Sequence, residues 1–132
     1  MLIIRPLDAH ITVDEEIIGT MDPYVTVTIG TEEKSTVWHV GGGKNPIWKD
    51  GLVFDKISNI NTLISLDVWD HDNISADDFI GNVTIDSSAI IQLGSAKSSY
   101  ELIRDGKVTG TINIKFDFMN KNGNSNNGVN QG

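Results

Sequence analysis

The sequence predicts an all-β domain built as an antiparallel β-sandwich. Apolar and polar residues alternate over several short runs, which is the period of a strand with one buried face. Segments rich in glycine, asparagine and aspartate separate these runs and supply turns. About eight short strands with hardly any helix are typical of a sandwich. The chain has 132 residues, which is enough for one domain with a real core.

Four strands are predicted in the first half of the chain, over 2–9, 22–29, 34–40 and 52–54. Pro6 cannot donate a backbone hydrogen bond, so the first strand is expected to lie at an edge or to contain a bulge. In the second strand, valine and isoleucine alternate with Thr26 and Thr28, which favours a half-buried strand. Residues 30–33 are expected to form a turn. Segment 45–48 is expected to be an ordered turn that docks a tryptophan.

Four further strands are predicted over 63–69, 79–85, 100–103 and 112–118. The last is the clearest, because isoleucine and phenylalanine alternate with polar residues throughout. Residues 105–106 (Asp-Gly) predict a turn. The pattern over 87–93 leaves two alternatives open, a helical turn or an irregular crossover.

A change of composition marks the domain boundary. Residues 1–119 are expected to form the domain, and 120–132 an asparagine- and glycine-rich disordered tail or a linker. The N-terminus does not resemble a signal peptide, and no apolar run is long enough to span a bilayer. The absence of cysteine fits a reducing compartment, so we expect a cytoplasmic protein.

The negative charge of the chain is concentrated in two short segments. The formal net charge is −8, from 18 acidic and 10 basic residues. Eight acids form two clusters: Asp14, Glu15, Glu16 and Asp22, then Asp70, Asp72, Asp77 and Asp78. The other ten acids balance the ten basic residues, so the whole net charge resides in these clusters. Without a basic stripe, nucleic-acid binding is not expected, whereas a cation site is.

The second cluster lies in a loop between two predicted strands. Crowded carboxylates are unfavourable unless a cation binds, and Ca²⁺ prefers oxygen ligands. The alternative is a solvated loop in which aspartate and asparagine form turns, but the presence of a second acidic cluster favours a metal site. An EF-hand is excluded, because its fifth, sixth and twelfth positions, counted from Asp70, hold Ile74, Ser75 and Gly81.

Several motifs together resemble the C2 domain, a calcium-dependent phospholipid-binding module of signalling and vesicle trafficking. They occur in that family's order: Asp22-Pro23-Tyr24-Val25, Asn45-Pro46-Ile47-Trp48, Val68-Trp69-Asp70-His71-Asp72 and Asp78-Phe79-Ile80-Gly81. The resemblance covers about residues 2–118. It implies an eight-stranded antiparallel Greek-key β-sandwich, with the family's type II topology, in which the extra strand is C-terminal. It also implies three loops at one end that bind calcium.

The resemblance also implies a set of calcium ligands. The carboxylates are those of Glu16, Asp22, Asp70, Asp72 and Asp78, and the further donors are the Ser75 hydroxyl and the His71 backbone carbonyl. Asp77 is expected to contribute only to an extra ion. Glu16 is a departure, because the family usually has aspartate there. Glu15 or Asp14 is an alternative at that position, so the number of ions and their affinity stay open.

The function implied is docking on an anionic phospholipid membrane when calcium rises. Ile17, Ile18 and Ile74 lie beside the acids at the predicted loop tips and are expected to contact the membrane, unless Ile17 or Ile18 folds back onto the core. The alternative is a C2 domain that binds a protein partner, with calcium structural or absent. The lysine run that binds phosphoinositides in many relatives is missing here.

Other side chains do not indicate chemistry. The sequence shows no paired nucleophile and base, so an enzyme is not expected. The protein is expected to be a monomer. Trp38 and Trp48 are expected to pack in the core or at an end of the sandwich.

Overall fold

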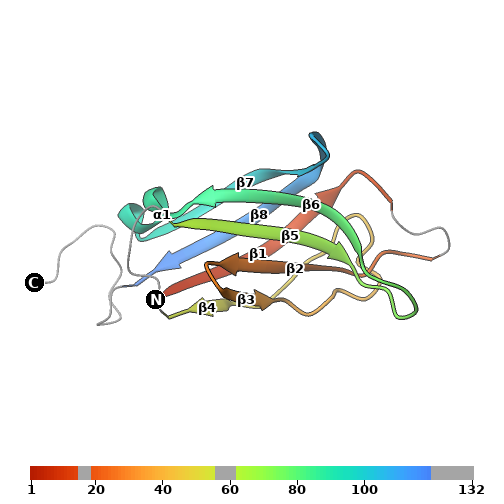
Figure 1. Ribbon diagram of the computed structural model, residues 1–132, viewed down its shortest axis with the longest axis horizontal. Coiled ribbons are helices and arrows are strands. Elements are labelled where there is room, and N and C mark those ends of the chain that lie inside the picture. Colours follow the sequence, from red (N-terminus) through yellow and green to blue (C-terminus); the bar gives the residue numbers. More distant parts are fainter. Residues whose placement is uncertain (15–18, 56–61, 120–132) are drawn as a thin grey trace, which may run out of the picture.

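The computed structural model describes residues 1–14, 19–55 and 62–119, which fold as a β-sandwich (Figure 1). Eight strands and one helix follow in chain order: β1 Leu2–Ile11, β2 Pro23–Ile29, β3 Glu32–Ser35, β4 Leu52–Phe54, β5 Leu63–Asp70, β6 Asp78–Asp86, α1 Ser87–Leu93, β7 Ser95–Arg104 and β8 Lys107–Phe118. Every strand pairing is antiparallel.

The strands form two layers of four. Hydrogen-bonded neighbours follow the order β3-β2-β5-β6-β7-β8-β1-β4. The first four strands make one layer and the last four the other, and only the pair Asn82 and Ile103 joins β6 to β7. The C-terminal strand β8 pairs along the whole of β1, so connections must cross between the layers. The predicted all-β Greek-key sandwich with a C-terminal extra strand is confirmed.

The inward faces of both layers form one apolar core. Alternate residues of β5 and β8 are fully buried, as the sequence alternation predicts: Ile64, Leu66, Val68, Ile112, Ile114 and Phe116. Burial of each such side chain contributes about 1.5–3 kcal/mol. Trp48 is 4% exposed, and its indole Nε1 donates to the Pro23 carbonyl at 3.0 Å. This confirms the predicted docking turn over 45–48, which ties the β3–β4 connection to the start of β2.

The predicted turn over 30–33 is present only at 30–31, and the strand predicted over 34–40 begins earlier and ends earlier, as β3 Glu32–Ser35. Glu32 already pairs with Ile29, and β3 ends at Ser35. Beyond Ser35, side-chain oxygens accept hydrogen bonds from backbone amides. The Thr36 hydroxyl accepts from the Val25 amide at 3.0 Å, and the Asp50 carboxylate accepts from the Val37 amide at 3.3 Å. The chain therefore leaves the strand conformation.

Three other details were underdetermined by the sequence. Pro6 coincides with a break of register between Pro6 and Asp8, so the expected bulge is present. β7 begins at Ser95, earlier than the predicted 100–103, because its polar first half pairs with β8 without an apolar alternation. Residues 87–93 form a helix, capped by the Asp86 carboxylate at its start and by Gly94 in the left-handed region at its end.

None of the helices in the described part of the chain is long and apolar enough to cross a membrane. The predicted tail, 120–132, lies outside the described residues.

The layers meet where Gly81 has no side chain. A Cβ at this position would lie 2.5 Å from the Thr109 Oγ1 and 2.8 Å from the Leu102 Cβ. The Thr109 hydroxyl donates to the Ile80 carbonyl at 2.8 Å, so β8 contacts β6 directly here. Gly81 thus allows β6 to approach β7 and β8 closely where the two layers meet.

We expect Gly81→Ala to lower the free energy of unfolding by about 2 kcal/mol, because a methyl group forced into this contact overpacks it. Urea denaturation measures the change. Gly51→Ala is the matched control, since its Cβ would meet mainly the flexible end of Arg5. Equal stability of the two variants would contradict this account of Gly81.

Candidate functional site

Two acidic loops meet at one end of the sandwich. Asp22 directly precedes β2, Asp70 ends β5, and Asp78 begins β6. In the ladders, Pro23 is opposite Asp70, and Asp70 is opposite Asp78. The register therefore gathers three predicted ligand positions from parts of the chain far apart in sequence. Figure 1 shows that the β5–β6 loop projects from this end, away from α1.

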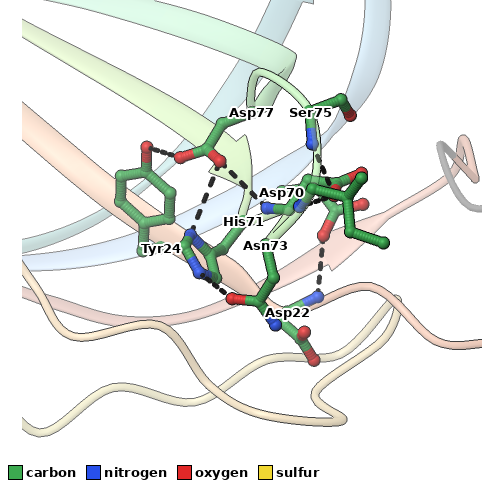
Figure 2. Close-up of polar contacts among 9 residues, drawn as sticks. Asp22, Tyr24, Asp70, His71, Asn73, Ser75 and Asp77 are labelled. Atoms are coloured by element: carbon green, nitrogen blue, oxygen red, sulfur yellow. Dashed lines mark hydrogen bonds and ion pairs between the residues drawn. The ribbon is translucent and has the colours of Figure 1, made fainter.

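Asp70 links the two loops. Its side chain is fully buried, and its Oδ1 accepts a hydrogen bond from the Asp22 amide at 2.8 Å. The His71 amide in turn donates to the Asp22 carbonyl at 3.1 Å. A carboxylate taken out of water is costly unless it is compensated by donors or cations. The buried Asp70 therefore fixes the end of the β1–β2 loop, at Asp22, against the β5–β6 loop (Figure 2).

Asp72 shapes the tip of the β5–β6 loop. Its Oδ1 accepts from the amides of Ile74, at 2.8 Å, and Ser75, at 3.2 Å. Hydrogen bonds from these two amides lower the pKa of the Asp72 carboxyl, so it stays ionised. The resulting turn places Ile74 at the tip with 98% of its surface exposed.

Asp77 is an internal acceptor. Its Oδ2 accepts from the Tyr24 hydroxyl at 2.5 Å, and its Oδ1 accepts from the Asp72 amide at 2.9 Å. The Tyr24 bond is the largest cause that lowers the pKa of Asp77, with the Asp72 amide and His71 contributing further. Burial, then the Asp77 carboxylate, raise the pKa of Tyr24. Figure 2 shows Asp77 pointing back toward Tyr24.

Sequence reasoning missed this role of Tyr24 and Asp77. The two residues are 53 positions apart, so no local pattern reveals the bond. The available signal was that Tyr24 lies on the outer face of β2 just two residues after the predicted ligand Asp22.

A third segment, the β3–β4 connection, reaches the same end. The Gly41 amide donates to the Asp22 Oδ1 at 2.8 Å, and the Trp38 indole stacks on the His71 imidazole, with ring centroids 3.8 Å apart. Trp48 is buried as expected, whereas Trp38 remains 46% exposed. Three loops therefore converge here, as the resemblance implied.

The donors fit calcium in kind, although they are not arranged as a closed cage. Within 1–14, 19–55 and 62–119, no three acidic or histidine side chains lie close enough together to hold a metal ion. The carboxylates of Asp22 and Asp72 each accept backbone amides instead. Glu16, Ile17 and Ile18 lie outside the described residues. Oxygen donors from aspartate, serine and a backbone carbonyl are the ligands that suit Ca²⁺.

Comparison with known proteins gives a consistent result. A family model described as the C2 domain matches residues 2–102. Elicitor-responsive protein 1 of Oryza sativa subsp. japonica is 35% identical over 112 residues, which cover 76% of this chain and 70% of that protein. The 16 kDa phloem protein 1 of Arabidopsis thaliana is 35% identical over 91 residues, which cover 66% of this chain and 58% of that protein.

A solved structure agrees in fold. The calcium-bound pair of C2 domains from extended synaptotagmin 2 matches with a TM-score of 0.72 at 17% identity, over 89% of this chain and 45% of that chain. At this level of identity the likeness concerns the fold alone.

We expect Tyr24→Phe to lower the calcium-free stability at neutral pH by about 1 kcal/mol, because a hydrogen bond to a carboxylate is lost. The pKa of Asp77 is depressed in the folded state, so its contribution is present above the unfolded pKa of about 3.9. That contribution is lost as the pH falls through the folded-state pKa.

Tyr24→Phe should therefore lose less stability than the wild type as the pH falls below about 4. Urea denaturation at several pH values, in chelator, measures both effects. Tyr100→Phe is the control, because Tyr100 packs edge-on against Phe116 away from the acidic loops. A Tyr24→Phe variant as stable as the wild type at every pH would rule out this role.

Proposed function

The chain belongs to the C2 domain family, and we propose that it is a calcium-dependent module that docks on anionic phospholipid membranes. The observation that carries this proposal is the convergence of Asp22, Asp70 and Asp78 at the end of the sandwich where Ile74 is exposed. The calcium-bound structure of the same fold is in line with the proposal.

The proposed calcium ligands are the described donors of both loops. Asp22, Asp70, Asp72 and Asp78 would supply carboxylates, the Ser75 side chain a hydroxyl, and the His71 backbone a carbonyl. Glu16 would complete the set from outside the described residues. When bound, calcium supplies positive charge and open coordination positions for lipid phosphate. In its absence, the amides of Ile74 and Ser75 keep the Asp72 carboxylate ionised and oriented, and the Gly41 amide orients the Asp22 carboxylate.

The switch in this proposal is electrostatic. The five carboxylates of the set carry a charge of −5, which repels an anionic membrane. Two calcium ions would bring this charge to about −1, and lipid phosphates would complete the coordination. Backbone hydrogen bonds and the Tyr24–Asp77 contact already join the loops, so little backbone motion is required.

The exposed tip adds an apolar contribution to docking. Ile74 is 98% exposed, and burying its side chain among headgroups would contribute about 1.5–3 kcal/mol. Ile17 and Ile18 are proposed to act in the same way.

A second candidate function is binding of a protein partner, with calcium structural or absent. The observation that favours it is that the acids already have hydrogen-bond donors within the protein. Asp72 accepts the Ile74 amide, and Asp77 accepts the Asp72 amide and the Tyr24 hydroxyl, so the loop is formed without a cation. Liposome cosedimentation with and without calcium distinguishes the two candidates.

We expect calcium to stabilise the domain. A ligand that binds only the native state adds about 2.7 kcal/mol at a hundredfold excess over its dissociation constant. The melting temperature should rise in millimolar calcium and return in EGTA. An unchanged melting curve, with no heat of calcium binding by calorimetry, would refute the metal proposal.

Asp72→Asn should weaken calcium binding and membrane binding together. Asparagine keeps a side-chain oxygen to accept the Ile74 and Ser75 amides, so the turn is retained while the negative charge is removed. Calorimetric titration with calcium and cosedimentation with phosphatidylserine vesicles measure the two effects. Undiminished calcium affinity would show that Asp72 is not a ligand.

Ile74→Asp should spare calcium binding and reduce vesicle affinity by about tenfold or more, because it removes an apolar tip and adds a charge. Leu63→Asp is the matched control, since Leu63 is 61% exposed at the opposite end of β5. Equal vesicle binding by the two variants would mean that Ile74 does not insert. Absence of vesicle binding by the wild-type protein at saturating calcium would instead support the protein-binding function.

A further inference from the structure

The β3–β4 connection carries an unusual concentration of exposed apolar side chains. Nine large apolar side chains are exposed in the described part of the chain, and four of them lie in this one segment: Val37 (68%), Trp38 (46%), Val40 (74%) and Ile47 (59%). Single exposed apolar residues are normal on a soluble protein, whereas a local group indicates an interaction surface. We call these four residues the apolar surface.

The apolar surface surrounds a hollow. This hollow has a volume of about 570 Å³ and is lined by Val37–Val40 and by Ile47–Asp50. Trp48 is buried beneath it and is fixed by its bond to the Pro23 carbonyl. The hollow therefore lies against a side chain that is packed in the core, and its lining can accept an apolar group.

The apolar surface is attached to the acidic loops. Trp38 stacks on His71, which lies between the proposed ligands Asp70 and Asp72. The Gly41 amide bonds to the Asp22 carboxylate, and the Gly43 amide donates to the Met21 carbonyl at 2.9 Å. Figure 1 shows the chain leaving β3 toward the end that carries the β5–β6 loop. A lipid headgroup at the proposed ion site would thus lie close to the Trp38 indole.

The β3–β4 connection, residues 36–51, carries a small net positive charge, unlike the acidic loops beside it. It contains two exposed lysines, Lys44 and Lys49, and one acidic residue, Asp50, whose carboxylate accepts the Val37 amide. Apolar side chains flanked by lysines, with a tryptophan at the margin, are the combination that binds an anionic lipid surface. An acidic partner without an apolar face would leave the four apolar side chains exposed. A neutral apolar partner would offer no negative charge to Lys44 and Lys49.

We propose that the apolar surface is a second lipid-contacting site that inserts into an anionic bilayer beside the β5–β6 loop. This inference rests on the proposed membrane docking and extends it to a segment that supplies no calcium ligand. Val40 and Trp38 enter the headgroup region, and Lys44 and Lys49 face lipid phosphates. With Ile74 as the other contact, the domain is held at two places and tilts toward the β3–β4 connection.

Val40→Asp tests the inference by affinity. We expect vesicles of phosphatidylserine and phosphatidylcholine to bind this variant about tenfold more weakly in calcium, with calcium affinity in the absence of lipid unchanged. Leu93→Asp is the control, because Leu93 is 55% exposed on α1 at the other end of the sandwich. Equal binding by the two variants, with wild type bound, would overturn the inference and leave the proposed function intact.

Trp38→Phe provides a second measurement that does not depend on a charge introduced into the protein. Vesicles with brominated acyl chains should quench the fluorescence of the wild type, and this quenching should largely disappear in Trp38→Phe. Of the other two tryptophans, Trp48 is buried and Trp69 packs against Phe79. Quenching that is unchanged in Trp38→Phe, or absent although vesicles are bound, would refute insertion. Failure of the wild type to bind any vesicle would refute the proposed function and this inference with it.

Discussion

The acidic end of the sandwich depends on one buried carboxylate. Asp70 ends β5 with no exposed surface, and it accepts the Asp22 amide from a loop 48 residues earlier in the chain. A carboxylate is tolerated at such a place only when donors or cations compensate its charge. The position of Asp70 follows from the ladders on both sides of β5, so the core packing of β2, β5 and β6 determines where the acidic loops meet.

The acids around Asp70 divide into two roles. Asp77 is used internally, because Tyr24 and the Asp72 amide occupy both of its oxygens. Asp72 forms a turn with its own loop and stays ionised, since the Ile74 and Ser75 amides lower its pKa. Backbone amides therefore replace part of the positive charge that a cation would bring. On the proposed function, calcium competes with these weak neutral donors rather than with protons at physiological pH.

The sequence predicted the features that follow from alternation and failed where side chains bond to a distant backbone. The core faces of β5 and β8 and the docking of Trp48 follow from local pattern. The end of β3 does not, because Thr36 and Asp50 replace ladder bonds that an alternating sequence would suggest. The polar first half of β7 carries no alternation at all. The Tyr24–Asp77 and Trp38–His71 contacts join residues far apart in sequence, so only the fold reveals them.

The three loops at this end differ in the force that would bring them to a membrane. The described acids of the β1–β2 and β5–β6 loops oppose contact with anionic lipid until a cation arrives. The β3–β4 connection, which has two lysines and one aspartate, offers apolar side chains that need no cation. Trp38 and Gly41 join the two kinds of surface directly to His71 and Asp22. On the proposals made above, the apolar surface contributes constant attraction and the acids a repulsion that calcium removes. The balance between them would set the calcium concentration at which docking occurs.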